Sequence, residues 1–270
     1  MRIIKAHTEF PLGLPGRLSL LKSIESVGRT CYKSPGKTCY VEPIRVKNEG
    51  DEHWTEKYAL FINSVQDSVY DSFEDACARK SQIEWETAEQ FIRTLIMNGH
   101  EAMLEHVSIT VKFVVDRGVS HELVRHRLAS FAQESTRYCN YSAEKFGREI
   151  TVIEPCFWTH EDNEAEYEAW IAAMYAAENS YLKLLEMGAL PQEARSVLPN
   201  SLKTEVVMTA NLREWRHFLK LRAAGVTGKP HPQMLEVAVP LLEKFKKLYP
   251  AVFFDINVKE EKEDGDETDK

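Results

Sequence analysis

The sequence lacks the loops that cradle phosphates with backbone amides, since neither GxGxxG nor a Walker A motif occurs in it. A bound nucleotide would therefore have to be held by side chains. The GxSxG turn of serine hydrolases and the HExxH pair of zinc proteases are also missing. No apolar run is long enough to span a bilayer, so we expect no membrane partner.

Cysteine is sparse. The five cysteines form no CxxC pair and show no zinc-ligand spacing. An odd number of irregularly spaced cysteines suits a reducing compartment. The first ten residues, MRIIKAHTEF, lack the apolar core of a signal peptide. We therefore expect a cytoplasmic protein without a metal ion.

Positive charge is in the minority, with 34 Lys and Arg against 42 Asp and Glu and a formal net charge of -8. This balance argues against a general nucleic-acid or membrane-surface binder. With 270 residues, 43% of them hydrophobic, the chain can bury the core of one large domain or two small ones.

Against this acidic background, basic side chains gather in the segment RHRLASFAQESTRY. Arg125, His126, Arg127 and Arg137 fall within thirteen residues, together with Ser135. Like charges this close repel one another unless an anion compensates them. Arginine forks match the oxygens of phosphates and carboxylates. The segment therefore predicts a site for a small phosphorylated ligand, and the alternative is a solvated basic face.

Hydrophobic periodicity gives a coarse map of the chain. We expect strands at residues 2–10, 107–116 and 202–209. We expect helices at residues 19–27, 85–98, 161–187, 191–195, 211–224 and 233–248. A loop is expected over 33–58, residues 59–84 fit neither pattern clearly, and Pro240 should kink or split the last helix.

Helix caps refine two of these expectations. Ser120 is a plausible N-cap for a helix that follows the strand at 107–116, with Val119 and Val124 at staple positions. Arg125 to Arg127 would then lie in the first two turns of that helix, near the positive end of its dipole. Asn211 is a second N-cap candidate.

Two further groups carry chemistry-bearing side chains. In NGHEAMLEH, His100 and His106 are six residues apart and so do not share a helix face, which disfavours a zinc site. His100 could lie flat beside an aromatic ligand or be an ordinary residue at a helix end. The other group lies nearer the C-terminus and consists of Arg195, Asn211, Arg213, His217, Arg222, His231 and Gln233.

These residues resemble the flavin-dependent thymidylate synthases. Arg125-His126-Arg127, seven residues and then Ser135 match the RHRx7S signature of that family. The similarity continues in GHExxxEH at 99–106, HELVRHR at 121–127, EARSVLP at 193–199 and the NLR…FLKLRA run at 211–223. It covers most of residues 85–250.

The resemblance implies an α+β fold, with a central antiparallel sheet flanked by helices. It implies that dTMP is made from dUMP, with methylene-tetrahydrofolate as carbon donor, FAD as hydride carrier and NADPH as reductant. It also implies a homotetramer with FAD and dUMP at subunit junctions. One domain would span residues 1–258, with a longer-than-usual insert at about 33–84. An acidic, disordered tail would follow at 259–270.

The resemblance assigns roles position by position. Residues assigned to dUMP are Glu122, Arg125, Gln133, Glu134, Ser135, Thr136, Arg137, Arg195 and Arg222. Residues assigned to FAD are Cys31, His100, Arg125, His126, Arg127, Gln133, Asn211, Arg213 and His217. Ser135 and Arg137 would meet the phosphate, Arg195 would come from another subunit, and His231 would lie on the folate or flavin side. Arg222 would favour the ionised N3 of uracil and is the expected catalytic residue.

The sequence departs from the family pattern at a few positions. Gln133 stands where many members have glutamate, His217 where asparagine is common, and Cys31 where serine or threonine often contacts FAD. The loop 225–230 is longer than usual. None of these departures removes a residue that the chemistry requires. Two other functions remain as alternatives, a non-catalytic nucleotide-binding protein of the same fold and an RNA- or DNA-binding module that uses the basic segment.

Overall fold

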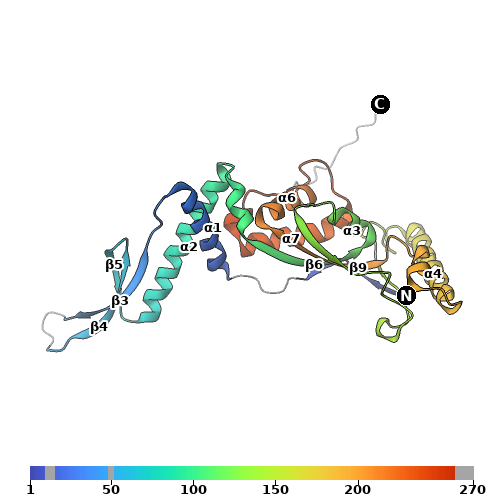
Figure 1. Cartoon of the computed structure of the whole chain (residues 1–270), viewed down its shortest axis with the longest axis horizontal. Coiled ribbons are helices and arrows are strands. Elements are labelled where there is room, and N and C mark those ends of the chain that lie inside the picture. Colours follow the sequence, from blue (N-terminus) through green and yellow to red (C-terminus); the bar gives the residue numbers. More distant parts are fainter. Residues whose placement is uncertain (10–15, 48–51, 259–270) are drawn as a thin grey trace, which may run out of the picture. The chain divides into compact units, whose positions relative to one another are not determined.

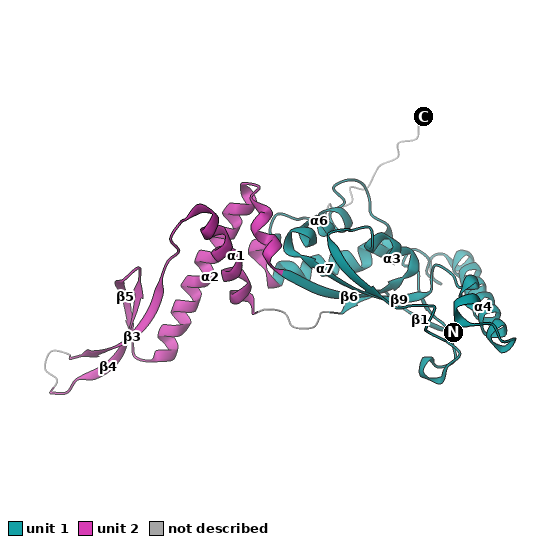
Figure 2. Ribbon diagram, in the orientation of Figure 1, with its two compact units in different colours: residues 1–13, 108–247, 253–270 teal, residues 14–107, 248–252 magenta. Residues whose placement is uncertain are grey.

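The computed structural model describes residues 1–9, 16–47 and 52–258. The tail expected at 259–270 lies outside these residues. The chain divides into two compact units (Figures 1 and 2). Unit 1 is built from Met1–Gly13, Ser108–Lys247 and Phe253–Lys270, and unit 2 from Leu14–Val107 and Leu248–Val252. The expectation of one domain over 1–258 stays a prediction, because two compact units can belong to one domain.

Unit 1 is organised around a four-stranded antiparallel sheet in the order β2-β6-β9-β7. Its strands are β2 (His7–Glu9), β6 (Ser108–Asp116), β9 (Lys203–Asn211) and β7 (Ala129–Gln133). Strand β1 (Arg2–Ile4) pairs in parallel with β8 (Thr151–Ile153). The antiparallel sheet with its helices confirms the predicted α+β class, and the strand expected at 2–10 is two short strands in different sheets.

The helices of unit 1 are α3 (Arg117–Leu123), α4 (Glu164–Glu186), α5 (Pro191–Ala194), α6 (Leu212–Arg222) and α7 (Pro232–Leu248). Unit 1 also contains the 3-10 turns η2 (Glu144–Phe146), between β7 and β8, and η3 (Arg195–Val197), between α5 and β9. The expectation of a kink or split at Pro240 is wrong as to a split, since α7 runs through that residue. None of the helices in the described parts of the chain is both long and apolar enough to cross a bilayer.

One face of the sheet carries the core of unit 1. Strand β9 alternates buried and half-buried residues, as expected for a sheet with one covered face. Helices α6 and α7 lie against the buried face (Figure 1). Phe113 of β6 stacks on Trp215 of α6, with ring centroids 6.3 Å apart, and Phe245 of α7 meets Trp215 edge-on at 5.5 Å. This packing fixes α6 on the sheet.

The opposite face of the sheet carries alternating charges. Lys112 lies 2.7 Å from Glu9 and 3.3 Å from Glu205. Lys203 lies 2.9 Å from both Glu205 and Glu134. The ion pairs therefore run from β2 through β6 and β9 to Glu134, the residue after β7, and keep this face polar.

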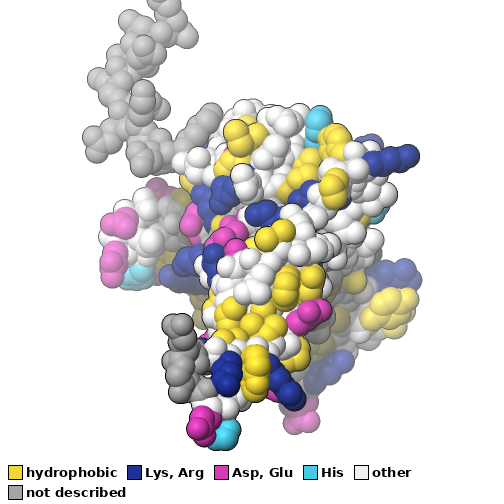
Figure 3. Space-filling view, turned by 90° about the vertical axis from the view of Figure 1, so that its left-hand side faces the viewer, with side chains coloured by type: hydrophobic (Ala, Val, Ile, Leu, Met, Phe, Trp, Pro, Cys, Tyr) yellow, Lys and Arg dark blue, Asp and Glu magenta, His cyan; other side chains and the backbone are white. Residues whose placement is uncertain are grey.

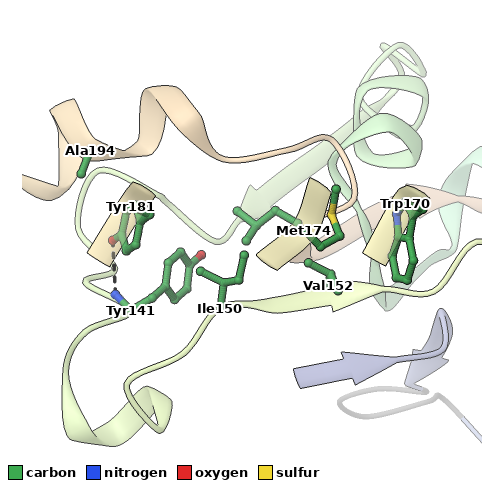
Figure 4. Packing of buried hydrophobic residues seen from close by; sticks show 8 residues of the cluster. Tyr141, Ile150, Val152, Trp170, Met174, Tyr181 and Ala194 are labelled. Atoms are coloured by element: carbon green, nitrogen blue, oxygen red, sulfur yellow. Dashed lines mark hydrogen bonds between the residues drawn. The ribbon is translucent and has the colours of Figure 1, made fainter. Parts of the chain in front are cut away.

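A second hydrophobic cluster of unit 1 lies under α4 (Figure 4). Trp170, Met174 and Tyr181 point from α4 toward Ile150 and Val152, and all five side chains are buried. These apolar side chains of α4 are therefore part of the core, and the predicted helix at 161–187 is confirmed with bounds of Glu164–Glu186.

Unit 2 contains two packed helices, α1 (Arg17–Tyr32) and α2 (Phe73–Met97), followed by the 3-10 helix η1 (Glu101–His106). The short α8 (Pro250–Phe253) lies in the C-terminal segment that joins this unit. Gly28 permits the close approach of α1 to α2, because a Cβ there would lie 2.7 Å from the ring of Phe91.

The loop expected over 33–58 is wrong. Strands β3 (Cys39–Val46), β4 (Thr55–Ile62) and β5 (Val65–Tyr70) form a three-stranded antiparallel sheet. Pro43 lies within β3, which is tolerated because β3 is an edge strand. Large apolar side chains of this region are exposed, namely Trp54 at 63%, Val65 at 68% and Phe73 at 48%. In Figure 3 the side of unit 2 that carries this sheet faces the viewer, and hydrophobic and basic side chains gather on it.

Candidate active site

The site begins where strand β6 passes into α3. Asp116 ends the strand and caps the helix, since its Oδ1 accepts a 2.8 Å hydrogen bond from the Val119 amide. The cap predicted at Ser120 is therefore wrong. Ser120 is fully buried inside α3, where its hydroxyl donates to the Arg117 carbonyl. The alternating sequence pattern identified Asp116 only as the last strand residue, whereas it both ends β6 and caps α3.

Because Asp116 and not Ser120 caps α3, the helix begins and ends earlier than predicted, and the basic cluster lies at a different place relative to it. Because α3 ends at Leu123, Arg125, His126 and Arg127 lie in the turn after the helix and not in its first turns. The prediction that they lie near the positive end of a helix dipole is wrong. They follow the carbonyl end, where the amides of Arg125 and His126 donate to the carbonyls of Glu122 and Leu123. A helix C-terminus is the end that stabilises cations.

The turn and α6 enclose one cavity of about 300 Å³. Its lining residues are Arg125, His126, Arg127, Leu128, Glu214, His217, Leu221 and Arg222. Arg125, Arg127 and His217 are exposed, whereas His126 is only 5% exposed. The structure thus brings together two segments that are about 90 residues apart in the chain, and four predicted FAD residues lie on one cavity.

His126 lies at the centre of this arrangement. Its Nδ1 is 3.1 Å from Glu214 Oε1 and its Nε2 is 3.3 Å from Arg222 Nε. Its ring meets Phe218 edge-on, with centroids 4.9 Å apart, and lies 5.9 Å from the ring of His217. Burial lowers the pKa of His126, and the charge of Arg222 adds to this, although the hydrogen bond with Glu214 opposes both.

Arg222 ends α6 and is held on two sides. Its Nη1 donates to Glu122 Oε2 at 2.7 Å, and its Nε points to His126. Glu122 comes from α3, so the guanidinium joins three segments of unit 1. Arg222 and Glu122 are both half-buried, which leaves part of the guanidinium accessible to a ligand.

Asn211 caps α6 as predicted. Its Oδ1 accepts a 2.9 Å hydrogen bond from the Glu214 amide. The amide oxygen of Asn211 is therefore engaged in the helix cap, while Arg213 on the first turn is exposed. Their contacts with FAD stay predictions.

His126, Glu214 and His217 also have the composition of a metal site, with ligand atoms within 4.8 Å of one another. The hydrogen bonds disfavour a metal there. Arg222 Nε can only donate, so His126 Nε2 accepts and the proton of the neutral ring is on Nδ1. A protonated Nδ1 cannot bind a metal. The expectation of no metal ion stays a prediction.

The second half of the site is the segment after β7. Gln133 donates from Nε2 to Ser120 Oγ at 3.0 Å and to Thr204 Oγ1 at 3.3 Å. Ser135 Oγ accepts from the Arg137 amide, and the exposed Arg137 guanidinium lies 5.6 Å from the ring of Tyr138.

Arg195 reaches this segment within the same chain. Its Nη1 donates to Thr136 Oγ1 at 3.2 Å, and Thr136 is 7% exposed. The short helix predicted at 191–195 is confirmed as α5, but it ends at Ala194, and Arg195 begins the 3-10 turn η3 that follows it. Arg195 therefore contacts the residue that lies between the two predicted phosphate ligands, Ser135 and Arg137. Its contribution to another subunit's site stays a prediction.

Glu134 differs from its neighbours. Its carboxylate is ion-paired with Lys203 and accepts from the Tyr141 hydroxyl at 3.1 Å. It lines a different cavity of about 470 Å³, together with Arg2, Lys145, Glu149 and Glu205. The walls of this larger cavity carry paired charges of both signs, so it suits a phosphorylated ligand less well than the cavity at Arg125 and Arg127.

Three predicted residues lie elsewhere. Cys31 and His100 belong to unit 2, where the Tyr32 hydroxyl hydrogen-bonds His100 Nδ1 and Cys31 is exposed. His231 belongs to unit 1, is exposed, precedes α7, accepts from the Gln233 amide and meets the Phe157 ring edge-on. The roles of all three stay predictions.

Sequence reasoning missed Glu214, which is 5% exposed and hydrogen-bonded to His126. A signal for it was present, because Asn211 and Glu214 have the spacing of a capping box. Glu214 and His217 are also three residues apart and share a helix face. In the folded chain the Glu214 side chain contacts His126, which the spacing alone does not indicate.

Comparison with known proteins identifies the family of this chain. Residues 20–251 match the family model described as Thymidylate synthase complementing protein. A flavin-dependent thymidylate synthase of Corynebacterium efficiens is 32% identical over 224 residues, covering 80% of this chain and 85% of the relative. One from Geobacter sulfurreducens is 33% identical over 166 residues, covering 61% and 68%.

A solved structure has a similar fold. The UMP/dUMP methylase PolB from Streptomyces cacaoi, bound with 5-Br dUMP, superposes with a TM-score of 0.63 over 94% of this chain and 96% of that chain, at 20% identity. The family match covers nearly the whole described chain and includes both cavity-lining segments. The chain belongs to the flavin-dependent thymidylate synthase family.

Proposed function

We propose that this protein is a flavin-dependent thymidylate synthase. It makes dTMP from dUMP, with methylene-tetrahydrofolate as carbon donor, FAD as hydride carrier and NADPH as reductant. The observation that carries the proposal is the placement of Arg222, which is held by Glu122 and His126 on a cavity lined by Arg125 and Arg127. Two relatives bear the name of this activity.

The donor set at the cavity fits FAD. Arg125 and Arg127 offer guanidinium forks for a diphosphate, and both are exposed. His217 offers an imidazole edge on the same cavity. A cavity of about 300 Å³ holds only part of so large a cofactor, so the remainder would extend along the surface toward Arg213. When bound, FAD supplies the hydride chemistry that side chains cannot.

The dUMP phosphate would bind the segment from Ser135 to Arg137. Ser135 and Thr136 offer hydroxyls, and Arg137 offers an exposed guanidinium. Arg195 is already hydrogen-bonded to Thr136. Two guanidiniums and two hydroxyls suit a dianionic phosphate. Gln133 and Glu134 directly precede these residues in the chain, and in the proposal both line the dUMP pocket.

Arg222 would activate the uracil ring. A guanidinium fixed in a half-buried site stabilises negative charge at N3 and so raises electron density in the ring. No thiolate is needed. Cys139 is the cysteine nearest in sequence to the segment from Ser135 to Arg137. Burial raises the pKa of Cys139, which keeps its thiol protonated at neutral pH.

The proposal includes a homotetramer. Arg125, Arg127, Arg213 and His217 leave the cavity open toward solvent, so a second subunit could complete it. His231, exposed at the start of α7, would face the folate or flavin.

The test is product formation by the purified full-length chain loaded with FAD. Addition of NADPH should bleach the bound flavin, and dUMP with methylene-tetrahydrofolate should restore its colour and yield dTMP. Mass spectrometry of the nucleotide detects the added methyl group. Binding of dUMP without any dTMP would favour the non-catalytic alternative, and retardation of RNA by a colourless protein would favour the nucleic-acid module.

A further inference from the structure

A continuous chain of four side chains crosses the candidate active site. Glu122 Oε2 accepts from Arg222 Nη1 at 2.7 Å, Arg222 Nε lies 3.3 Å from His126 Nε2, and His126 Nδ1 lies 3.1 Å from Glu214 Oε1. This row of hydrogen-bonded side chains has a carboxylate at each end, Glu122 and Glu214, and its His126–Glu214 half is buried. His126 and Glu214 are each 5% exposed.

The hydrogen bonds among these four side chains are compatible with one placement of the His126 proton. The Nε–H of Arg222 has no lone pair, so it donates and His126 Nε2 must accept. The proton of the neutral imidazole is then on Nδ1, where it can donate to Glu214. The carboxylate of Glu214 is an acceptor only, and it therefore selects this tautomer.

We propose that Glu214 is a positioning residue for Arg222. By accepting the Nδ1 proton of His126, it turns the Nε2 lone pair toward the guanidinium, which is then held at Nε by His126 and at Nη1 by Glu122. The role of Arg222 at uracil rests on the proposed function, whereas the tautomer of His126 does not.

The alternative tautomer shows why the acceptor matters. With its proton on Nε2, His126 would point an N–H at the Nε–H of the half-buried Arg222, and two donors would face each other. A donor left without an acceptor in such a site is strongly unfavourable. Arg222 would move away, and a displacement of about 1 Å can lower a rate by roughly a hundredfold.

Several charged groups face His126. From α6 they are Glu214, His217 and Arg222, from the turn Arg125 and Arg127, and, through Arg222, Glu122 from α3. Glu214 favours the imidazolium, while burial, Arg222 and His217 oppose it and together lower the pKa of His126. The ring is therefore neutral at neutral pH. On acidification Nε2 gains a proton, and the hydrogen bond from Arg222 is lost.

The first experiment uses nitrogen NMR of the full-length protein labelled at the histidine rings. The His126 signals are identified by their absence in His126→Asn. Wild type should show Nδ1 protonated and Nε2 bare. Glu214→Leu, which removes the acceptor, should move the proton to Nε2, and Glu214→Gln, which keeps an acceptor oxygen, should restore the wild-type tautomer. A bare Nδ1 in wild type, or an unchanged tautomer in Glu214→Leu, would overturn the proposal.

The second experiment measures dUMP-dependent oxidation of the bound flavin against pH. Glu214→Leu should lower its rate by about a hundredfold, and Glu214→Gln should stay within about tenfold because a neutral acceptor replaces a charged one. Glu214→Gln should also shift the acidic limb to lower pH, since the anion that favours the imidazolium is gone. An acidic limb that does not move would count against the proposal.

Glu178→Gln is the matched control. Glu178 is 7% exposed in unit 1 and accepts from the Ile150 amide at 3.0 Å, away from His126. Its substitution should alter the melting temperature without moving the pH profile. If wild type makes no dTMP, the proposed function fails, while the NMR experiment still decides whether Glu214 sets the tautomer of His126.

Discussion

The Arg222 guanidinium donates to the Glu122 carboxylate at 2.7 Å, although the two residues are 100 positions apart in the chain. Glu122 lies in the last turn of a helix that follows one sheet strand, and Arg222 ends a helix that follows the neighbouring strand. The register of β6 and β9 therefore determines where the two side chains meet. An ion pair between half-buried partners limits the rotamers that Arg222 can adopt before any ligand binds.

Arg222→Lys tests this arrangement. Lysine keeps the charge and can reach Glu122, but it lacks the planar fork and the Nε donor to His126. We expect the variant to slow dUMP-dependent oxidation of the bound flavin far more than flavin reduction by NADPH. Stopped-flow absorbance of the flavin measures the two steps separately.

Cys139→Ser is the control for the same assay. Burial raises the pKa of Cys139, so its thiol is a poor nucleophile at neutral pH. We expect this variant to be nearly silent. An inactive Cys139→Ser beside a normal Arg222→Lys would mean that uracil is activated by thiolate attack, and the assignment of Arg222 would be wrong.

Ser135→Ala separates a phosphate ligand from a nucleophile. The hydroxyl already accepts from the Arg137 amide at 3.3 Å, and no base is hydrogen-bonded to it among the described residues. A neutral hydrogen bond is worth about 0.5–1.5 kcal/mol, so dUMP should bind roughly three- to tenfold more weakly while turnover persists. Isothermal titration and steady-state rates measure the two effects. Complete inactivity, with a nucleotide adduct on the wild-type serine, would contradict the prediction.

Much of the fold could be predicted from the sequence where the pattern was local. The stripe through Trp170, Met174 and Tyr181 has helical period, and all three side chains are buried on α4. The alternation from 107 to 116 is strand β6, and Asn211 caps the helix that follows β9. In each case neighbouring residues alone determine the element.

Other elements depend on partners that are distant in the sequence. Strand β3 contains Pro43 and charged residues, and it is a strand because β4 pairs with it along its full length. The cap of α3 was misplaced because Asp116 serves both the strand and the helix. Local patterns do not distinguish a strand's last residue from a helix's first cap.

The candidate site also contains residues that the sequence identified and a residue that it did not. Motif similarity named Arg125, His126 and Arg222, and the structure brings them to one cavity. Glu214 was missed because its partner, His126, is 88 residues away. The resemblance assigned Glu134 to dUMP together with Ser135, and in the structure its carboxylate pairs with Lys203, so its role at dUMP stays a prediction.

Arg137→Ala tests the phosphate assignment. The guanidinium is exposed and rests near the Tyr138 ring at 5.6 Å, so the fold should not depend on it. A charge-assisted hydrogen bond is worth about 1.5–3 kcal/mol. We expect the dissociation constant for dUMP to rise by about one to two orders of magnitude, with flavin still bound. Deoxyuridine, which has no phosphate, should bind both proteins equally poorly. A variant that still prefers dUMP strongly over deoxyuridine would contradict the assignment.

Asp116 gives a stability prediction with a defined pH dependence. It is 3% exposed, and burial raises the pKa of its carboxyl although the Val119 amide opposes this. The native state therefore holds the Asp116 proton to higher pH than the unfolded chain does. As the pH rises through the native pKa, the contribution of Asp116 to the free energy of unfolding falls.

Two substitutions separate the cap of Asp116 from its charge. Asp116→Ala loses the acceptor for the Val119 amide and should lower the free energy of unfolding by about 1 kcal/mol. Asp116→Asn keeps an acceptor oxygen and cannot ionise, so at about pH 8 it should be as stable as wild type or more so, and any advantage should shrink as the pH falls. Urea denaturation at several pH values measures both. If Asp116→Asn were as unstable as Asp116→Ala throughout, ionised Asp116 would be required by the fold, and the raised pKa would be wrong.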